Sequence, residues 1–358
     1  MAIEWGEPWD EWKTPELILR DWQGRLEGLA AEEGERFARL PGVLGAAVIG
    51  TVPRGSAWPL SDVDILTVVE PEHGAETEAR VCAEETRSNR RLAEERVPNE
   101  VEARFWVRRA DRLRSANATE DGLFEFLARP HQAGIVFKAP GGRVVADFDG
   151  QVCAFIGRCE RIVFGRRFVR MCVDDEVRAE SARLEVASEL ARAGECVAAN
   201  ALALLAAHEM TAALHLRWRA LPESISRAVT RLVRLAEAHE ARVGEAFLTA
   251  SGLSEEETWR RFAAAPPWAA RERDVLLAVR RGAGEDVDEL DVTRDLLHVT
   301  SYLAARAGDG GPCPAWLTAR NTLADARERL RAARSMLEYL AAACEELAAD
   351  DEGIGEEE

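Results

Sequence analysis

The sequence predicts an α+β N-terminal domain, with a mixed sheet flanked by helices, followed by an all-α C-terminal domain. The chain of 358 residues is longer than a typical single domain. Short apolar runs typical of buried strands occur before Gly150, whereas long runs rich in Ala, Leu, Arg and Glu follow it. We therefore expect domains at residues 1–150 and 151–350 and an acidic tail at 351–358.

The first predicted element is a helix that begins at Thr14 and ends before Pro41. A threonine caps a helix well, the proline after it suits the first turn, and apolar residues recur at helical spacing from there on. Two continuous apolar runs follow, at 43–49 and 63–69. Runs of this length and composition are typical of buried strands.

The rest of the N-terminal domain is predicted from composition and alternation. The charged segment 72–96 has helical composition, and residues 101–107 alternate between apolar and polar as a half-buried strand does. Residues 133–138 and 143–148 flank the turn Pro140-Gly141-Gly142, which predicts a β-hairpin.

The C-terminal domain is predicted to contain only helices. The stretch 177–221 is helical throughout, and no strand signal appears after it. Breaks between helices are expected at Pro222, Pro266-Pro267, 282–284 and 308–314.

The charge balance disfavours a broad nucleic-acid-binding surface. The chain has 46 basic and 64 acidic residues, and its net charge of −18 repels a phosphate backbone. The basic residues are nearly all arginine, with Lys13 and Lys138 as the lysines, which we interpret as a coding bias.

Cysteine usage and the absence of apolar targeting signals favour a soluble, cytoplasmic protein. The seven cysteines form no Cys-x-x-Cys pair and lie in apolar stretches, which predicts buried free thiols in a reducing compartment. The first residues lack the pattern of a signal peptide, and charged residues interrupt every long apolar run, so no membrane association is expected.

The most informative segment joins the two predicted N-terminal strands. Asp62 and Asp64 stand two residues apart at the entry of the second strand, so their side chains lie on one face. Paired carboxylates repel each other unless a divalent cation lies between them, and their hard oxygens suit Mg²⁺. Upstream, Gly50-Thr51 follows the first strand, where a glycine lets the backbone approach a phosphate. An isolated Asp-x-Asp is also common in solvated turns.

The succession of a strand, Gly50-Thr51, a spacer and Asp62-x-Asp64 resembles the DNA polymerase β-like nucleotidyltransferase superfamily, in particular its minimal and aminoglycoside-modifying members. That family has a Gly-Ser pair after a strand, a spacer, and then an acid-x-acid motif. Ten residues separate Thr51 from Asp62 here, whereas an alternative anchor at Gly55-Ser56 leaves too short a spacer. Thr51 replaces the usual serine but keeps the hydroxyl. The resemblance implies that Gly50, Thr51, Arg54 and Ser61 bind the nucleotide.

The family also uses a third carboxylate on a later strand, and Glu102 in Val101-Glu102-Ala103 matches that setting. In the aminoglycoside-adenylylating relatives an acid so placed binds metal and acts as the base toward the acceptor hydroxyl. The resemblance implies that Asp62, Asp64 and Glu102 are the metal-binding and catalytic residues. Glu100 is the alternative on the same strand face, but it follows Pro98-Asn99 and is expected at the strand mouth. Both acids are also compatible with a solvated edge strand.

The resemblance therefore implies a Mg²⁺-dependent transferase with one or two metal ions. It would move a nucleoside monophosphate, AMP from ATP, to a hydroxyl of a small acceptor. The acidic net charge favours a cationic acceptor such as an aminoglycoside, which would make the protein an antibiotic-resistance enzyme. The alternative is a module that transfers AMP to a partner protein or only binds nucleotide. A polymerase or tRNA-tailing role is disfavoured by charge.

Two helical histidines, His208 and His298, are expected to be satisfied or exposed rather than metal ligands. The spacing from Arg294 to His298 is one residue shorter than the Arg-His ribonuclease signature of the helical partners of minimal nucleotidyltransferases. Several arginines of the helical half, among them Arg192, Arg217 and Arg219, are candidates to contact a triphosphate, and the sequence does not select among them.

Overall fold

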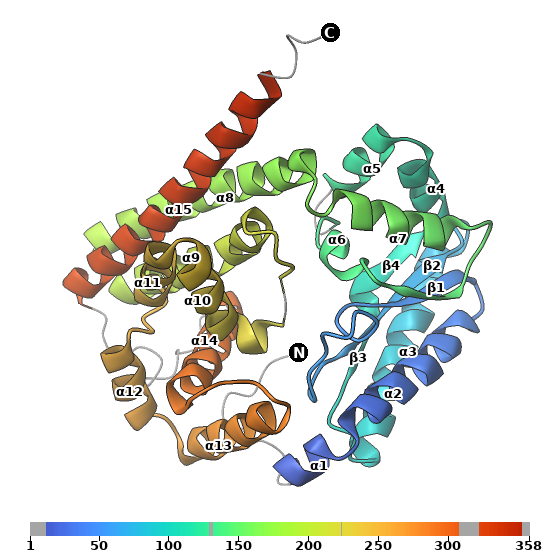
Figure 1. The fold of residues 1–358 in the computed structure, drawn as a ribbon, viewed down its shortest axis with the longest axis horizontal. Helices are drawn as coiled ribbons and strands as arrows, with labels where there is room; N and C mark the ends of the chain where they lie inside the picture. The colour runs from blue at the N-terminus through green and yellow to red at the C-terminus, as the bar shows by residue number, and fades with distance from the viewer. Residues whose placement is uncertain (1–11, 129–131, 223, 308–321, 353–358) are drawn as a thin grey trace. The chain divides into compact units, whose positions relative to one another are not determined.

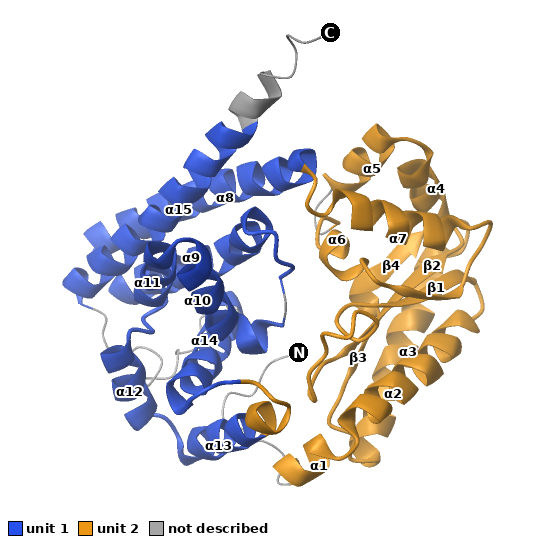
Figure 2. Cartoon of the chain, viewed as in Figure 1, with its two compact units in different colours: residues 1–9, 166–278, 286–358 blue, residues 10–165, 279–285 orange. Residues whose placement is uncertain are grey.

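The computed structural model describes residues 12–128, 132–222, 224–307 and 322–352, so the end of the predicted acidic tail and the predicted break at 308–314 lie outside the described residues. The described chain divides into two compact units, coloured in Figure 2. We call residues 12–165 with 279–285 the α+β unit, and residues 166–278 with 286–352 the helical unit. The predicted α+β class with a mixed sheet is confirmed.

The α+β unit contains the sheet and the helices that cover it (Figure 1). Its elements are α1 (Pro15–Leu19), α2 (Trp22–Ala38), β1 (Val43–Ile49), β2 (Val63–Val69), α3 (Gly74–Glu94), β3 (Val101–Glu102), η1 (Arg104–Trp106), β4 (Val107–Arg109), α4 (Ala110–Ala118), α5 (Glu120–Leu127), α6 (Ile135–Lys138), β5 (Arg143–Ala146) and α7 (Gln151–Ile162).

The sheet is mixed, with strand order β3-β2-β1-β5 and with β4 also paired to β2. β1 is antiparallel to β2 and β5, whereas β3 and β4 run parallel to β2. Val63 and Ile65 of β2 pack into a core with α2 and α3 residues, among them Phe37 and Val81. Because side chains alternate along a strand, Asp64 points to the opposite face.

The opposite face of the sheet is covered in part by α7, which contacts β1 and β5. Gly45 of β1 lies directly against Val152 of α7. The division between the compact units therefore falls after Gly165, later in the chain than the composition switch at Gly150, and α7 is part of the α+β unit.

The predicted helix from Thr14 to Pro41 is interrupted. Thr14 caps α1 as expected, because its hydroxyl accepts a hydrogen bond from Leu17 N–H at 3.4 Å. Asp21 then takes a left-handed conformation with φ 42° between α1 and α2, which separates the two helices.

The predicted strand at 101–107 is wrong in its middle. Only Val101–Glu102 and Val107–Arg109 pair with β2, and Arg104–Trp106 form a 3₁₀ turn between them. The carboxylate of Glu85 accepts hydrogen bonds from Ala103 N–H at 2.8 Å and Arg104 N–H at 2.6 Å. These two amides are thereby removed from the ladder.

The predicted hairpin around Pro140-Gly141-Gly142 is also wrong. Residues 135–138 form the short helix α6, and Gly142 N–H closes the turn after it by donating to Ala139 O at 2.9 Å. β5 pairs instead with the outer edge of β1, antiparallel. The turn residues were correct, but they follow a helix.

The helical unit contains no strand among its described residues, as expected. Its elements are α8 (Arg166–Arg192), α9 (Cys196–Arg217), η2 (Ile225–Arg227), α10 (Ala228–His239), α11 (Ala241–Ala250), α12 (Glu255–Ala263), α13 (Pro267–Gly282), α14 (Glu289–Ala307) and α15 (Leu323–Glu352), with the end of α13 counted in the α+β unit. The breaks at Pro222, Pro266-Pro267 and 282–284 are confirmed. α8, α9 and α15 pack together, as Figure 1 shows.

α9 is long and apolar enough to cross a membrane by length and composition, but a core helix of a soluble protein meets the same criteria, and α9 packs on α8 and α15. The six described cysteines are free, and Cys313 lies outside the described residues. Their expected burial is wrong for Cys82 and Cys153, which are exposed.

Candidate functional site

Three predicted carboxylates come together on the α7 side of the sheet. In the parallel pairing of β2 with β3, Asp64 lies in register with Glu102. Asp62 precedes Asp64 by two residues and shares its face. The backbone before β3 continues the pairing, since Val63 N–H donates to Glu100 O at 2.8 Å. Glu100 itself is exposed, whereas Glu102 is half-buried and Asp64 is buried.

The electrostatics of these carboxylates show that they share one environment. Burial raises the pKa of Asp62 to about 8, and the carboxylates of Glu102, Asp64 and Glu100 raise it further, against the opposing effect of Lys138. Burial also raises the pKa of Glu102 to about 7, with Asp64 as the main charged contributor. A positive charge between carboxylates placed in this way stabilises their charged form.

Two side chains that were not predicted from the sequence as site residues contact Asp64. Trp106 Nε1 donates to Asp64 Oδ1 at 3.0 Å, and Lys138 Nζ lies 2.8 Å from Asp64 Oδ2. The ammonium group of Lys138 also lies 5.8 Å from the centre of the Trp106 ring. Both oxygens of the Asp64 carboxylate thus have a protein partner.

The loop after β1 is fastened to the end of α6. Gly50 N–H donates to Lys138 O at 2.7 Å, and Arg54 Nη1 donates to Phe137 O at 2.7 Å. Gly50 has φ 84°, a conformation that favours glycine. Two of the residues predicted to bind nucleotide therefore position Lys138 in this structure.

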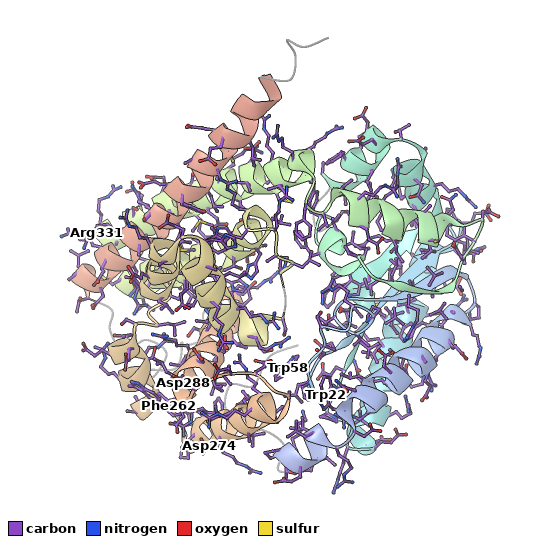
Figure 3. The ribbon with its side chains drawn as sticks, viewed as in Figure 1. Trp22, Trp58, Phe262, Asp274, Asp288 and Arg331 are labelled. Atoms are coloured by element: carbon purple, nitrogen blue, oxygen red, sulfur yellow. The ribbon has the colours of Figure 1, made fainter. Side chains whose placement is uncertain are left out.

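The other two predicted nucleotide-binding residues close the same loop on itself. Thr51 Oγ1 donates to Ser61 Oγ at 3.3 Å, and Trp58 N–H donates to the same Ser61 oxygen at 2.9 Å. Figure 3 labels Trp58, which is buried within this loop. Thr51 and Ser61 are both buried, so their hydroxyl groups shape the loop that leads into Asp62.

Two side-chain amides, of the buried Asn99 and the half-buried Asn89, fix the approach to both acidic strands. Asn99 Nδ2 donates to Pro59 O at 2.9 Å and to Ser61 O at 3.0 Å, which ties the segment before β3 to the segment before β2. Asn89 of α3 pairs with both backbone groups of Val101, at 2.8 and 3.0 Å. Together with Glu85, these side chains set the position of Glu102 relative to Asp64.

The donor set suits Mg²⁺, because three carboxylates supply hard oxygens on one face, and the raised pKa values of Asp62 and Glu102 show that negative charge is disfavoured there. Among the described residues, however, no three such side chains stand ready as metal ligands. Lys138 occupies one oxygen of Asp64, so metal ligation by that oxygen requires a local rearrangement.

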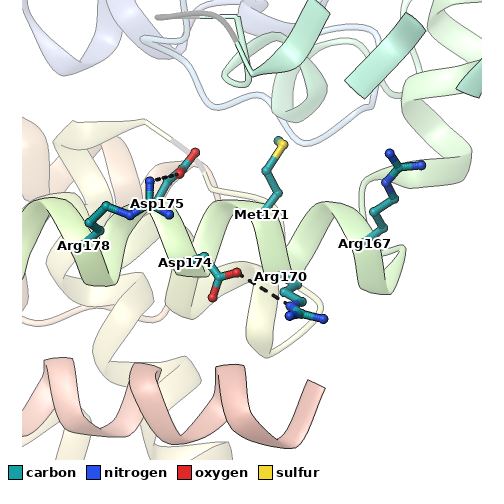
Figure 4. A pocket seen from close by; sticks show the side chains of 6 residues that line it. All are labelled: Arg167, Arg170, Met171, Asp174, Asp175 and Arg178. Atoms are coloured by element: carbon teal, nitrogen blue, oxygen red, sulfur yellow. Dashed lines mark hydrogen bonds and ion pairs between the residues drawn. The ribbon is translucent and has the colours of Figure 1, made fainter. Parts of the chain in front are cut away.

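The helical unit has a broad hollow of about 540 Å³ along α8, lined by Arg167, Arg170, Met171, Asp174, Asp175 and Arg178. Figure 4 shows that its charged groups pair with each other along the helix. Arg170 lies 3.7 Å from Asp174, and Arg178 lies 3.3 Å from Asp175. Asp174 and Asp175 are thus each paired with an arginine of the same helix.

The two histidines expected to be satisfied or exposed form a pair, in which His298 is buried and His208 is half-buried. His208 Nδ1 and His298 Nε2 are 2.8 Å apart, and the rings of His208 and Tyr302 lie in tilted contact with their centres 3.9 Å apart. Burial lowers the pKa of His208 to about 4 and that of His298 well below its ordinary value. One nitrogen is satisfied in each ring, but His298 Nδ1 is buried with no hydrogen-bond partner.

No protein-family model, curated protein or solved structure matches this chain. The functional assignment therefore depends on the residues of the chain and on the geometry described above.

Proposed function

We propose that the α+β unit is a nucleotidyltransferase domain and that the protein transfers a nucleoside monophosphate, AMP from ATP, to a hydroxyl group of a small acceptor. The observation that supports this most is the register of Asp64 with Glu102, with Asp62 on the same face. Three carboxylates on or directly before neighbouring strands are the donor set that Mg²⁺-dependent phosphoryl chemistry uses.

Each carboxylate has a distinct part in the proposed reaction. Asp62 and Asp64 would hold one or two Mg²⁺ ions, which supply positive charge next to the triphosphate. Glu102, which belongs to the next strand, would accept the proton of the acceptor hydroxyl. The acceptor oxygen then forms a bond to the α-phosphorus, the bond from that phosphorus to the bridging oxygen breaks, and pyrophosphate leaves. The raised pKa of Glu102 suits a group that takes up a proton near neutral pH.

The charge of the chain supports a cationic acceptor. A net charge of −18 attracts a polycation. An aminoglycoside fits this description, because it carries several ammonium groups beside its hydroxyl groups.

The direct test incubates the protein with each labelled nucleoside triphosphate, Mg²⁺ and a panel of acceptors, and measures pyrophosphate release and the mass of the product. We expect ATP and an aminoglycoside to give an adenylylated acceptor. A gain of AMP mass on a copurifying protein would instead support the protein-modifying alternative.

Binding is measured separately with a non-hydrolysable ATP analogue by calorimetry, with Mg²⁺ or with a chelator. We expect much tighter binding with Mg²⁺ in the wild-type protein and no such difference in Asp64→Asn. Equal affinity under the two conditions in the wild-type protein would contradict the paired-carboxylate site.

A further inference from the structure

Lys138 stands where a positive charge is needed among the three carboxylates. Its ammonium group lies 2.8 Å from Asp64 Oδ2, and Asp64 is only 1% exposed. Lys138 is also the group that opposes the rise in pKa of both Asp62 and Glu102. Within the described parts of the chain, Lys138 thus acts on all three carboxylates.

The choice of lysine is informative in this chain. Lys13 and Lys138 are the two lysines among 46 basic residues. A lysine ammonium is a compact point charge on a flexible stem, whereas an arginine carries a broad planar fork. The compact ammonium therefore resembles a small metal ion more closely than a guanidinium does.

The backbone and the side chain of Lys138 differ in their freedom. Lys138 O accepts the hydrogen bond from Gly50 N–H at 2.7 Å, and the preceding carbonyl, Phe137 O, is held by Arg54. The side chain is one-third exposed and ends in the ion pair with Asp64. The side chain is thus able to leave while α6 stays in place.

We propose that Lys138 substitutes for the metal ion: its ammonium group holds Asp64 in the metal-free protein, and metal binding displaces it. This inference rests on the proposed function, because it concerns the same carboxylates. A divalent cation on Asp64 would lie within a few ångströms of the ammonium, where two positive charges repel each other strongly. Metal binding and the Lys138–Asp64 ion pair therefore compete.

The small number of lysines makes a direct test possible in the full-length wild-type protein. Selective isotope labelling of lysine gives side-chain NMR signals from Lys13 and Lys138, and Lys13→Arg assigns them. We expect addition of Mg²⁺ alone to move the Lys138 signal and to leave that of Lys13 in place. In Asp64→Asn, Mg²⁺ is expected to move neither signal.

A second measurement tests the competition itself. Calorimetric titration with Mg²⁺ compares the wild-type protein with Lys138→Met, and Lys13→Met is the matched control. We expect Lys138→Met to bind Mg²⁺ about tenfold more tightly or better, because the opposing charge is gone. Its melting temperature without metal is expected to fall and to recover when Mg²⁺ is added, since the cluster then has its cation.

The outcomes separate this inference from the proposed function. Mg²⁺ binding that depends on Asp64 but leaves the Lys138 signal unmoved overturns the inference and leaves the metal site intact. Equal or weaker Mg²⁺ affinity in Lys138→Met overturns it in the same way, and the NMR result decides if that variant does not fold. Absence of any Mg²⁺ binding that depends on Asp64 overturns both.

Discussion

Gly50 and Asp64 lie so close together that a methyl group on Gly50 would overlap the Asp64 carboxylate. Gly50 directly follows β1, and Asp64 belongs to β2, where it pairs with Ile49 of β1 in the antiparallel ladder. Gly50 also has φ 84°. A glycine is therefore required here for two reasons, the backbone conformation and the space taken by the Asp64 carboxylate.

Gly50→Ala is expected to displace Asp64 and to abolish Mg²⁺-dependent nucleotide binding, with a loss of about 1–3 kcal/mol in the free energy of unfolding. Gly55→Ala is the matched control, because Gly55 has φ 69° and open space around its Cα. Gly55→Ala is expected to be destabilised only by its backbone conformation, and it should keep nucleotide binding. Calorimetry and urea denaturation check both variants, and equal loss of binding in the two would show that the Asp64 contact is unimportant.

Glu102→Gln is expected to lower turnover about 10²–10⁴-fold, the usual contribution of a general base. Nucleotide affinity should fall much less, because Asp62 and Asp64 remain. The structure supports Glu102 over Glu100, since Glu102 is half-buried and in register with Asp64 while Glu100 is exposed. Turnover and affinity are measured by pyrophosphate release and calorimetry.

Glu100→Gln is the internal control for that experiment and should have a mild effect. Loss of turnover in Glu100→Gln with normal turnover in Glu102→Gln would reverse the assignment of the base. If neither variant affects turnover, the proton acceptor lies elsewhere or the protein does not catalyse the transfer.

Glu85→Gln tests whether the break after Glu102 positions that residue. Glu85 accepts two backbone hydrogen bonds, from Ala103 and Arg104, and pairs with the Arg104 side chain. Loss of its charge is expected to destabilise the protein by about 1–3 kcal/mol and to lower turnover. Glu84→Gln is the control, because Glu84 is equally buried on α3 but pairs with Arg36 and Arg87.

Glu84→Gln should lower the free energy of unfolding. Its turnover should fall only in proportion to the fraction of protein that is folded. Urea denaturation and pyrophosphate release measured on the same samples separate the two effects. If the two variants lose turnover in proportion to stability alone, Glu85 has no positioning role.

The strongest predictions from sequence concerned local signals. β1 and β2 begin and end at the predicted residues, because continuous apolar runs bounded by polar and glycine-rich segments admit few other structures. The prediction that Asp62 and Asp64 share one face followed from the position of β2. The strand at 101–107 failed because Glu85, on a different element, takes the amides that alternation assigns to a ladder.

The cation of the site escaped prediction for a related reason. Lys138 reaches Asp64 across 74 positions of sequence, through a helix where a hairpin was expected. The rarity of lysine in the chain was visible, but we interpreted it as a coding bias. Likewise, nothing local indicated that Trp106 would donate to Asp64 rather than pack in the core.

The His208–His298 pair predicts a pH-dependent stability of the helical unit. Burial lowers the pKa of His208 to about 4, whereas an unfolded histidine titrates near 6.5. Between these values the unfolded chain binds a proton that the folded protein does not. The contribution of His208 to the free energy of unfolding should therefore fall as the pH falls from about 6.5 toward 4.

Glu176 acts in the opposite direction, because burial and neighbouring carboxylates raise its pKa to about 8 in the folded protein. Lowering the pH from 7 to 5 therefore relieves a cost at Glu176 while it imposes one at His208, and the wild-type slope alone is not diagnostic. Urea denaturation at both pH values measures how much of the free energy of unfolding is lost between pH 7 and pH 5. This loss should be about 1–2 kcal/mol smaller in His208→Gln than in the wild-type protein. The same loss should be larger in Glu176→Gln than in the wild-type protein, because the variant lacks the compensating proton uptake at position 176. If both substitutions leave the difference between pH 7 and pH 5 unchanged, neither group is shifted by burial in the folded protein.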